Sequence, residues 1–439
     1  MAGRKGVIGM LLKNVRLLTR NGDGKWSTAT SDVLIEGDKI KEIGTFDHEI
    51  TGHEVVDGKG MLAAPGLING HQHTPMSLLR CYSDDVPLMT WLNEKMLPIE
   101  MKMDENDRYI GALLSMAEMI KSGTTAYADM YIGMDQVADA VTHSGIRASL
   151  ARGLIAMDSN FEGRLQEAAD VVDRYHGAAD GRITTMIAPH SPYMCPPDLL
   201  KGAVSLASEK GVPLHIHLAE TKDEERMIQE RYGMRPVQYL QENGVFEQPV
   251  LLAHGVHFNE DDFNVLKNIK GGIVHNPVSN AKLGCGISDV KKLMELGITV
   301  GLGTDGAGSA STLDLFMEMK AASWMQKLKY EDAGVLSAHE VLSMATVNGA
   351  ELLGLGGVAG ELKPGMKADL ILLNMNQLHL TPSYEEASLL VYAASGHDVD
   401  TSIINGKMVM RGRELLTVDE EKLKFDARSR AEGLLQRLS

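Results

Sequence analysis

The chain has 439 residues, more than one hydrophobic core usually supports, so we expect one large domain and a smaller one. The formal net charge of −16 excludes most nucleic-acid binders, because these need a basic face. The three cysteines (Cys81, Cys195 and Cys285) are widely spaced, which argues against a disulfide framework and against a thiolate zinc site. No run approaches the ~20 apolar residues that cross a bilayer. We therefore expect a cytoplasmic homo-oligomer with a small-molecule partner, no nucleic acid and no membrane.

The first sixty residues have the pattern of β-structure, with short apolar runs interrupted by Gly and Asp, as in VLIEGDKIKEIG (33–44). The stretch GVIGMLLKNVRLLT (6–19) predicts a strand that follows a loose leader before Met10. Near the other end, KADLILLN (367–374) and SIINGKMVMRGREL (402–415) return to this pattern, and a helix is predicted at 420–438. We expect both chain ends, 1–64 and 358–439, to form one small β-sandwich domain.

Between these ends, short apolar runs alternate with amphipathic stretches, which is the rhythm of a parallel sheet with crossover helices. Eight strand-like runs can be counted: GLINGHQH (66–73), TTAYADM (124–130), RASLARGL (147–154), ITTMIAPHSPY (183–193), PLHIHLAE (213–220), PVLLAHGVH (249–257), GGIVHNPVSN (271–280) and TVGLGTDG (299–306). Eight such units predict an α/β fold with a (β/α)8 TIM-type barrel over 65–357.

Ionisable residues gather at the carboxyl ends of these runs, the face of a barrel on which active sites lie. His71 and His73 end the first run and point to one side of a strand. The fifth run offers His215 and His217, of which His217 is nearer the strand end, and the eighth offers Asp305. Neutral imidazoles with one carboxylate and room for water are typical of a catalytic divalent-metal site, which we expect to hold His71, His73, His217 and Asp305. His215 is the structural alternative.

A metal ion lowers the pKa of a bound water to about 7, and the reaction also needs groups that move protons. Glu220, three residues after a ligand, is placed to shuttle a proton. His254, at the end of the sixth run, and Asp305 are candidate proton acceptors. His257 falls past that strand end and is expected to be exposed, whereas His275 remains an open candidate behind the ligands.

The combined motifs closely resemble the amidohydrolase superfamily over nearly the whole chain: PGLINGHQH, HIHLAE, LLAHGVH, GTDG and ELKPGMKADLILLN. Many members of that superfamily hold two metals bridged by a modified lysine on strand four. The run ITTMIAPHSPY has no lysine, so the resemblance implies the branch of deaminases with one divalent metal, most readily zinc. His254 then resembles a catalytic residue beside that metal.

A closer resemblance is to the 5-methylthioadenosine/S-adenosylhomocysteine deaminases, and the segment SDDVPLMTWLNEKMLPIE (83–100) carries it. It implies that Trp91 packs against the 5′ substituent of the nucleoside and that Glu100 accepts hydrogen bonds from the ribose hydroxyls. Taken alone, Trp91 could belong to the core and Glu100 to a solvated helix.

The same resemblance gives roles to further residues. His190 would contact the purine edge, and Glu220 and Asp305 would touch the ring that reacts. Arg152 and Arg164 would face the homocysteine carboxylate, which a guanidinium binds in a bidentate manner. Arg164 is equally typical of an exposed helix start.

The implied reaction is hydrolytic deamination of the adenine ring of 5-methylthioadenosine and S-adenosylhomocysteine to inosine analogues and ammonia. Deaminases of 5′-deoxyadenosine, adenosine or guanine share this chemistry. A triazine-type chlorohydrolase would use the same activated water on a ring without ribose. A non-catalytic scaffold of the same fold would lose metal ligands, and this chain keeps a full set.

Overall fold

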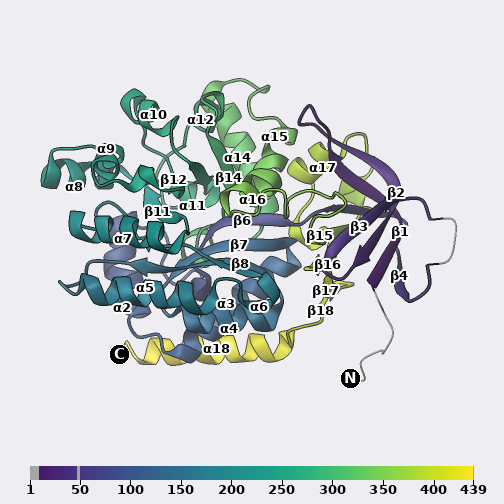
Figure 1. The fold of residues 1–439 in the computed structure, drawn as a ribbon, viewed down its shortest axis with the longest axis horizontal. Helices are drawn as coiled ribbons and strands as arrows, with labels where there is room; N and C mark the ends of the chain where they lie inside the picture. Colours follow the sequence, from purple (N-terminus) through teal and green to yellow (C-terminus); the bar gives the residue numbers. More distant parts are fainter. Residues whose placement is uncertain (1–8, 47–49, 439) are drawn as a thin grey trace.

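The two chain ends come together in one sheet in the computed structural model, which describes residues 9–46 and 50–438. This sheet lies to the right in Figure 1. Its strands are β1 (Gly9–Arg20), β2 (Trp26–Glu36), β3 (Lys39–Gly44), β4 (His53–Asp57), β5 (Met61–Pro65), β15 (Leu370–Asn374), β16 (Val399–Ile404), β17 (Lys407–Arg411) and β18 (Glu414–Leu415). Their order is β18-β17-β16-β15-β5-β1-β2-β3, and β4 pairs with β1.

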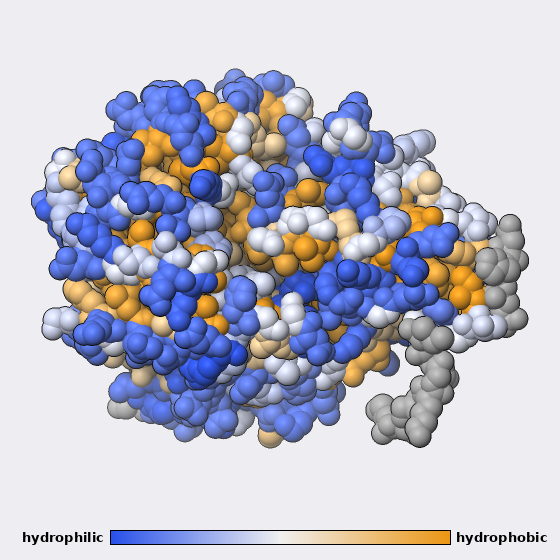
Figure 2. Space-filling view, viewed as in Figure 1, coloured by the Kyte–Doolittle hydropathy of each residue, from blue (hydrophilic) through white to orange (hydrophobic). Residues whose placement is uncertain are grey.

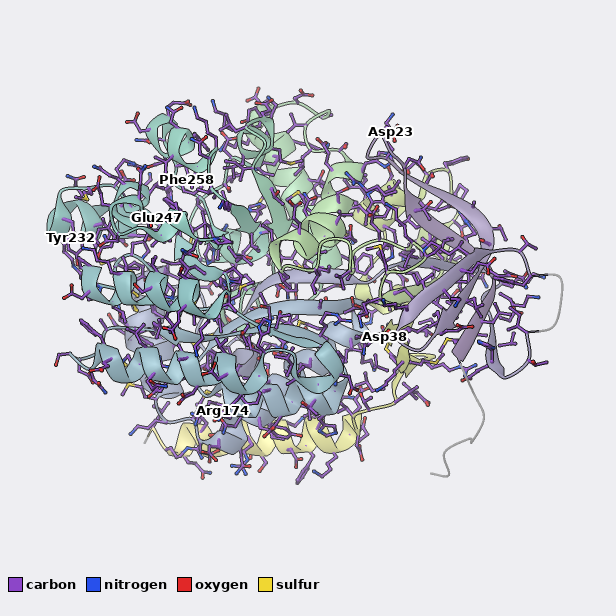
Figure 3. The ribbon with its side chains drawn as sticks, viewed as in Figure 1. Asp23, Asp38, Arg174, Tyr232, Glu247 and Phe258 are labelled. Carbon is purple, nitrogen blue, oxygen red and sulfur yellow. The ribbon has the colours of Figure 1, made fainter. Side chains whose placement is uncertain are left out.

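The antiparallel pairing of β5 with β15 joins the ends, with Ala64 opposite Ile371. Asp38, labelled in Figure 3, forms an ion pair with Lys367 and so links the same two parts of the chain. The first strand begins at Gly9, and residues 6–8 of the predicted strand lie outside the described residues. Strands from both chain ends therefore share a single mixed sheet.

The middle of the chain forms parallel strands, which confirms the predicted α/β class. They are β6 (Leu67–Gln72), β7 (Thr124–Tyr131), β8 (Arg147–Leu154), β9 (Ile183–Thr185), β10 (Ala188–Pro189), β11 (Leu214–Leu218), β12 (Val250–His254), β13 (Gly271–His275) and β14 (Thr299–Leu302). The order is β6-β7-β8-β10 in one sheet, with β9 also on β8, and β11-β12-β13-β14 in the other.

Backbone contacts connect these two parallel sheets at both edges. Ile187 and Leu214 form a parallel bridge between them. At the other edge, the Asp305 N–H donates to the His71 carbonyl at 3.0 Å. The fourth run was predicted as one strand, but the structure divides it into β9 and β10, with Met186 and Ile187 between them.

Helices surround the parallel strands in Figure 1. The longer ones are α3 (Glu105–Lys121), α4 (Met134–Ser144), α5 (Phe161–Tyr175), α7 (Pro197–Lys210), α8 (Lys222–Tyr232), α9 (Pro236–Glu242), α10 (Glu260–Leu266), α14 (Leu315–Tyr330), α17 (Glu386–Tyr392) and α18 (Glu420–Gln436). Short helices are α1 (Leu88–Thr90), α2 (Leu97–Glu100), α6 (Ala178–Gly181), α11 (Pro277–Lys282), α12 (Val290–Glu295), α13 (Ala307–Ala310), α15 (Ala338–Ser343) and α16 (Gly349–Leu352). The 3-10 helices are η1 (Thr74–Leu79), η3 (Val245–Glu247), η5 (Leu378–Leu380) and η6 (Gly396–Asp398), and the π-helices are η2 (Trp91–Met96) and η4 (Met344–Asn348).

The helix α3 begins with an Asp104–Asp107 capping box and ends before Gly123, whose φ of +90° an L side chain rarely adopts. The C-terminal helix α18 packs against α3, and Lys121 and Glu420 form an ion pair between them at 2.6 Å. The chain therefore returns from the mixed sheet to the helical layer before it ends.

The surface in Figure 2 is mainly hydrophilic on the face in view, with smaller apolar areas between. Within residues 9–46 and 50–438, no helix is long and apolar enough to cross a membrane.

Candidate metal centre and active site

Three imidazoles converge at the carboxyl ends of β6 and β11. His71 and His217 lie on these strands and His73 directly follows β6. Ligand atoms of the three rings all lie within 4.8 Å of one another, and the Nε2 atoms of His73 and His217 are 3.2 Å apart. His71 is fully buried, and its Nε2 has no hydrogen-bond partner within residues 9–46 and 50–438. Such a converging set, with an unpartnered buried nitrogen, fits a divalent metal ion.

The opposite nitrogen of each ring is already engaged, which fixes the orientation of the ring. The Nδ1 partners are His215 Nε2 for His71 (2.9 Å), the Met130 carbonyl for His73 (2.6 Å) and the His190 carbonyl for His217 (2.7 Å). Outer hydrogen bonds of this kind orient metal ligands in proteins. Burial, with the neighbouring imidazoles, holds the pKa of His71 and His217 well below its usual range. Both rings are therefore neutral, as metal binding requires. His215 lies behind His71 rather than in the ligand group.

Asp305 completes the group of candidate ligands. Its Oδ1 lies 3.3 Å from His73 Nε2 and 3.5 Å from His71 Nε2. Its Oδ2 accepts hydrogen bonds from the hydroxyls of Ser279 (2.6 Å) and Ser309 (2.7 Å). Burial by itself would raise the pKa of Asp305. The imidazoles of His73 and His254 and the two serine hydroxyls nevertheless hold this pKa below its usual value. The carboxylate is thus ionised and fixed in place.

Glu220 and His254 lie beside this group at the ends of β11 and β12. The His254 Nδ1 and a Glu220 carboxylate oxygen are 3.8 Å apart. The His254 ring is oriented by Asn280, whose side-chain oxygen is 2.9 Å from Nδ1. Burial raises the pKa of Glu220, although His254 opposes this. A carboxyl group whose pKa is raised by burial therefore faces the same space as an oriented imidazole.

A cavity of about 150 Å³ opens onto these groups. Its metal end is lined by His73, His190, His217, Glu220, His254 and Asp305. Its far end is lined mainly by apolar side chains: Leu88, Leu92, Leu97, Met101, Ile132, Ile155 and Met157. The cavity can therefore accept a flat polar ring at one end and an apolar group at the other.

The predicted Trp91 and Glu100 both line this cavity, as does His190. Glu100 accepts a hydrogen bond from the Tyr131 hydroxyl. Burial raises the pKa of Glu100 above its usual value, although the hydrogen bond from Tyr131 opposes this shift. Burial, with the nearby histidines, lowers the pKa of His190 to about 3, so this ring is a neutral hydrogen-bonding group.

The amidohydrolase family model matches residues 62–409. The chain is 47% identical to the 5-methylthioadenosine/S-adenosylhomocysteine deaminase of Carboxydothermus hydrogenoformans, over 96% of this chain and 97% of that protein. It is also 47% identical to the deaminase of the same name from Pelotomaculum thermopropionicum, over 98% and 99% of the two chains. The chain belongs to the amidohydrolase family. The family prediction from its motifs is confirmed.

Solved structures agree with this assignment. A zinc-bound adenosine deaminase from Xanthomonas campestris aligns with a TM-score of 0.92 at 28% identity, over 98% of this chain and 99% of its own. An atrazine chlorohydrolase from Arthrobacter aurescens complexed with zinc aligns with a TM-score of 0.90 at 24% identity, over 96% and 100% of the two chains. The second likeness concerns the fold of this amidohydrolase and not its reaction.

Two arginines predicted to face the homocysteine carboxylate do not line the cavity of this amidohydrolase. Arg152 pairs with Glu167 on α5 at 2.5 Å. Arg164 pairs with Asp158 at 2.8 Å. Each guanidinium would have to leave a carboxylate of its own chain before it could bind one from a ligand.

Two histidines differ from their expected surroundings. His257, expected to be exposed, is half-buried, and its Nε2–H donates to the Cys285 carbonyl at 2.7 Å. His275 is buried, and neither ring nitrogen has a hydrogen-bond partner among the described residues. Neither side chain lines the cavity.

Sequence reasoning missed the residues that hold the catalytic candidates in place. Ser279 and Asn280 follow β13 in the run GGIVHNPVSN, in which His275 was the residue named as a candidate. Tyr131, the partner of Glu100, ends β7. Ser279 and Asn280 lie on α11 just after β13. Placement at or shortly after a strand end was a usable signal, because polar residues there face the same layer as the ligands.

Proposed function

We propose that the chain hydrolytically deaminates the adenine ring of 5-methylthioadenosine and S-adenosylhomocysteine, giving the inosine analogues and ammonia. The observation that carries this proposal is the cavity that joins the buried ligand group to Glu100 and Trp91. The names of the relatives at 47% identity over nearly their full length support the same reaction.

One divalent metal, zinc, is the cofactor in this proposal, held by His71, His73, His217 and Asp305. When bound, such an ion activates water for attack on an electrophilic carbon. The absence of lysine from residues 183–193 supports one metal, since a bridging lysine would have to come from that strand. The zinc in the two neighbouring structures supports the choice of metal.

The protein groups supply orientation and proton transfer. Glu220 protonates ring nitrogen N1 while C6 is attacked. His254 and Asp305 accept the two protons that the water loses, one as it attacks and one as the C6 carbonyl forms. One of these protons is returned to the departing ammonia as the C6–N bond breaks, and the other restores the proton of Glu220. His190 meets the purine edge as a neutral donor or acceptor. Glu220 and Asp305 thus contact the substrate as well as its reacting atoms.

The ribose and the 5′ group occupy the far end of the cavity. Glu100, held by Tyr131, accepts hydrogen bonds from the ribose hydroxyls, and Trp91 packs on the 5′ substituent. Arg152 and Arg164 take the homocysteine carboxylate after exchanging their present partners. The carboxylates that the two arginines would leave, Glu167 and Asp158, are largely exposed to solvent, which lowers the cost of the exchange.

The fold proposal that accompanies this function is a closed (β/α)8 barrel over 65–357. The contacts at both edges of the two parallel sheets support closure. A small β-sandwich domain from 1–64 and 358–439 is the second part, with α18 reaching back to α3. Location in the cytoplasm and assembly into a homo-oligomer remain predictions from the sequence.

A panel of substrates tests the proposal. Loss of adenine absorbance and release of ammonia are followed with 5-methylthioadenosine, S-adenosylhomocysteine, 5′-deoxyadenosine, adenosine and guanine, and chloride release is followed with a chlorotriazine. We expect the highest kcat/KM with the first two compounds and loss of all turnover after chelation, restored by zinc. Turnover of the triazine alone would overturn the proposal, because that ring has no ribose for Glu100.

A further inference from the structure

The turn that presents Glu220 has an unusual backbone. The strand β11 ends at Leu218, and the next residue, Ala219, has a φ of +54°. A residue with a Cβ rarely adopts this left-handed conformation without support from its surroundings. Glu220 follows directly, so any relaxation of Ala219 would turn the Glu220 side chain away from the cavity.

A second carboxylate, Glu224, holds this turn from the helix that follows. Its Oε1 accepts the Ala219 N–H at 2.9 Å and its Oε2 accepts the Glu220 N–H at 3.1 Å. The side chain is buried, with 1% of its surface exposed, and it lies in the first turn of α8. The hydroxyl of Thr221 in turn accepts the Glu224 N–H at 3.2 Å. Each carboxylate oxygen therefore has its own backbone donor.

The carbonyl side of the same turn is held by the strand that carries His254. The Ala219 carbonyl accepts the N–H groups of Val256 and His257, both at 2.9 Å. The Gly255 N–H donates to the Leu218 carbonyl at 3.0 Å. With Glu224 on one side and these amides on the other, both the N–H and the carbonyl of Ala219 are hydrogen-bonded.

We propose that Glu224 is a positioning residue for Glu220: by accepting two successive backbone N–H groups, it fixes the turn that aims the Glu220 carboxyl at the substrate ring. Glu224 does not line the cavity. The inference rests on the proposed function, since it assigns Glu220 to proton transfer. A glutamine at 224 would offer one acceptor oxygen and one NH2 group to two N–H donors, so it could satisfy only one of them.

A double-mutant cycle with E224Q and E220Q tests this role, with 5-methylthioadenosine as substrate and single-turnover conditions so that slow variants can be measured. We expect E224Q to lower kcat on the order of 100-fold, the scale of a misplaced catalytic group, with KM and metal content near wild type. In the E220Q background the same change should cost almost nothing, because the group it positions is gone. A loss that is equal in both backgrounds, or a loss of metal, would show that Glu224 acts elsewhere.

Two further variants allow the result to be interpreted. Asp223→Asn changes a half-exposed carboxylate one residue away, which pairs with Arg226, and should leave kcat unchanged. If E224Q does not fold, E224D retains the charge with a shorter reach, and its kcat should lie between wild type and E220Q. A wild-type chain that releases no ammonia from any nucleoside would refute the proposed function, whereas an active wild type matched by E224Q would refute only this inference.

Discussion

The two ends of the cavity differ in how their polar side chains are partnered. At the metal end, His71, His217 and Asp305 each have a second hydrogen-bond partner that fixes them. At the far end, apolar side chains dominate, and Arg152 is engaged with Glu167 outside the cavity wall. The end that carries out the chemistry is thus organised before substrate binds. In the proposed function, the end that would take the 5′ group has to exchange partners, so we expect its contribution to be smaller and to depend on the substrate.

The largest effect expected from this comparison is at the metal end. Replacing Glu220 by Gln should lower kcat by about 1,000-fold, because a positioned acid or base contributes roughly 100- to 10,000-fold. Metal content, measured by atomic emission, should stay at the wild-type value. Glu247→Gln, at the exposed position labelled in Figure 3, is the matched control and should be fully active. Wild-type turnover in E220Q would remove Glu220 from the mechanism.

A smaller loss of kcat is expected at Asn280, which acts on the reaction only by orienting His254. Asn280→Leu removes the acceptor that orients His254 and should lower kcat by about 10- to 100-fold with little change in KM. The control is Asn264→Leu, an exposed position on α10. If N280L changed KM alone, the idea of a pre-organised metal end would be wrong.

Tyr131→Phe probes the border between the two ends. The variant loses the hydroxyl that donates to Glu100, and KM for ribonucleosides should rise about 10-fold, as for a hydrogen bond to a charged group. KM for the 2′,3′-dideoxy analogue should not change, because it offers Glu100 no hydroxyl. Tyr384→Phe, 91% exposed, is the control. An equal rise for both substrates would contradict the assignment of Glu100 to the ribose.

The smallest effect belongs to the far end. Arg152→Met should lower kcat/KM for S-adenosylhomocysteine by about 5-fold, within the range of a partly exposed charge-assisted hydrogen bond, and leave 5-methylthioadenosine unaffected. Arg174→Met, on α5 in Figure 3 and paired with Asp135, should affect neither substrate. Equal losses for the two substrates would mean that Arg152 supports the fold and not the carboxylate.

Site residues that belong to motifs at strand ends could be predicted from the sequence. Residues whose role depends on a hydrogen bond or an ion pair formed in the folded chain could not. His71, His73 and His217 were identified because alternation along a strand and position at its end are visible in sequence. The parallel α/β class followed from the same runs. The break between β9 and β10, at Met186 and Ile187, was missed.

The ion-pair partners of Arg152 and Arg164 could not be predicted from the sequence. Both arginines pair with carboxylates on nearby segments, and sequence alone does not say which carboxylate a flexible guanidinium meets. Asn280 and Glu224 were missed for a related reason, since each acts through a tertiary or turn hydrogen bond that depends on strand-end backbone geometry.

The most direct test of the central claim is the deamination of 5-methylthioadenosine in water enriched in oxygen-18. The account predicts that one oxygen-18 atom appears at C6 of the product and that ammonia is released in equal amount, as measured by mass spectrometry and an ammonia assay. A product that retains the amino group, or one in which the glycosidic or thioether bond has been cleaved instead, would contradict it.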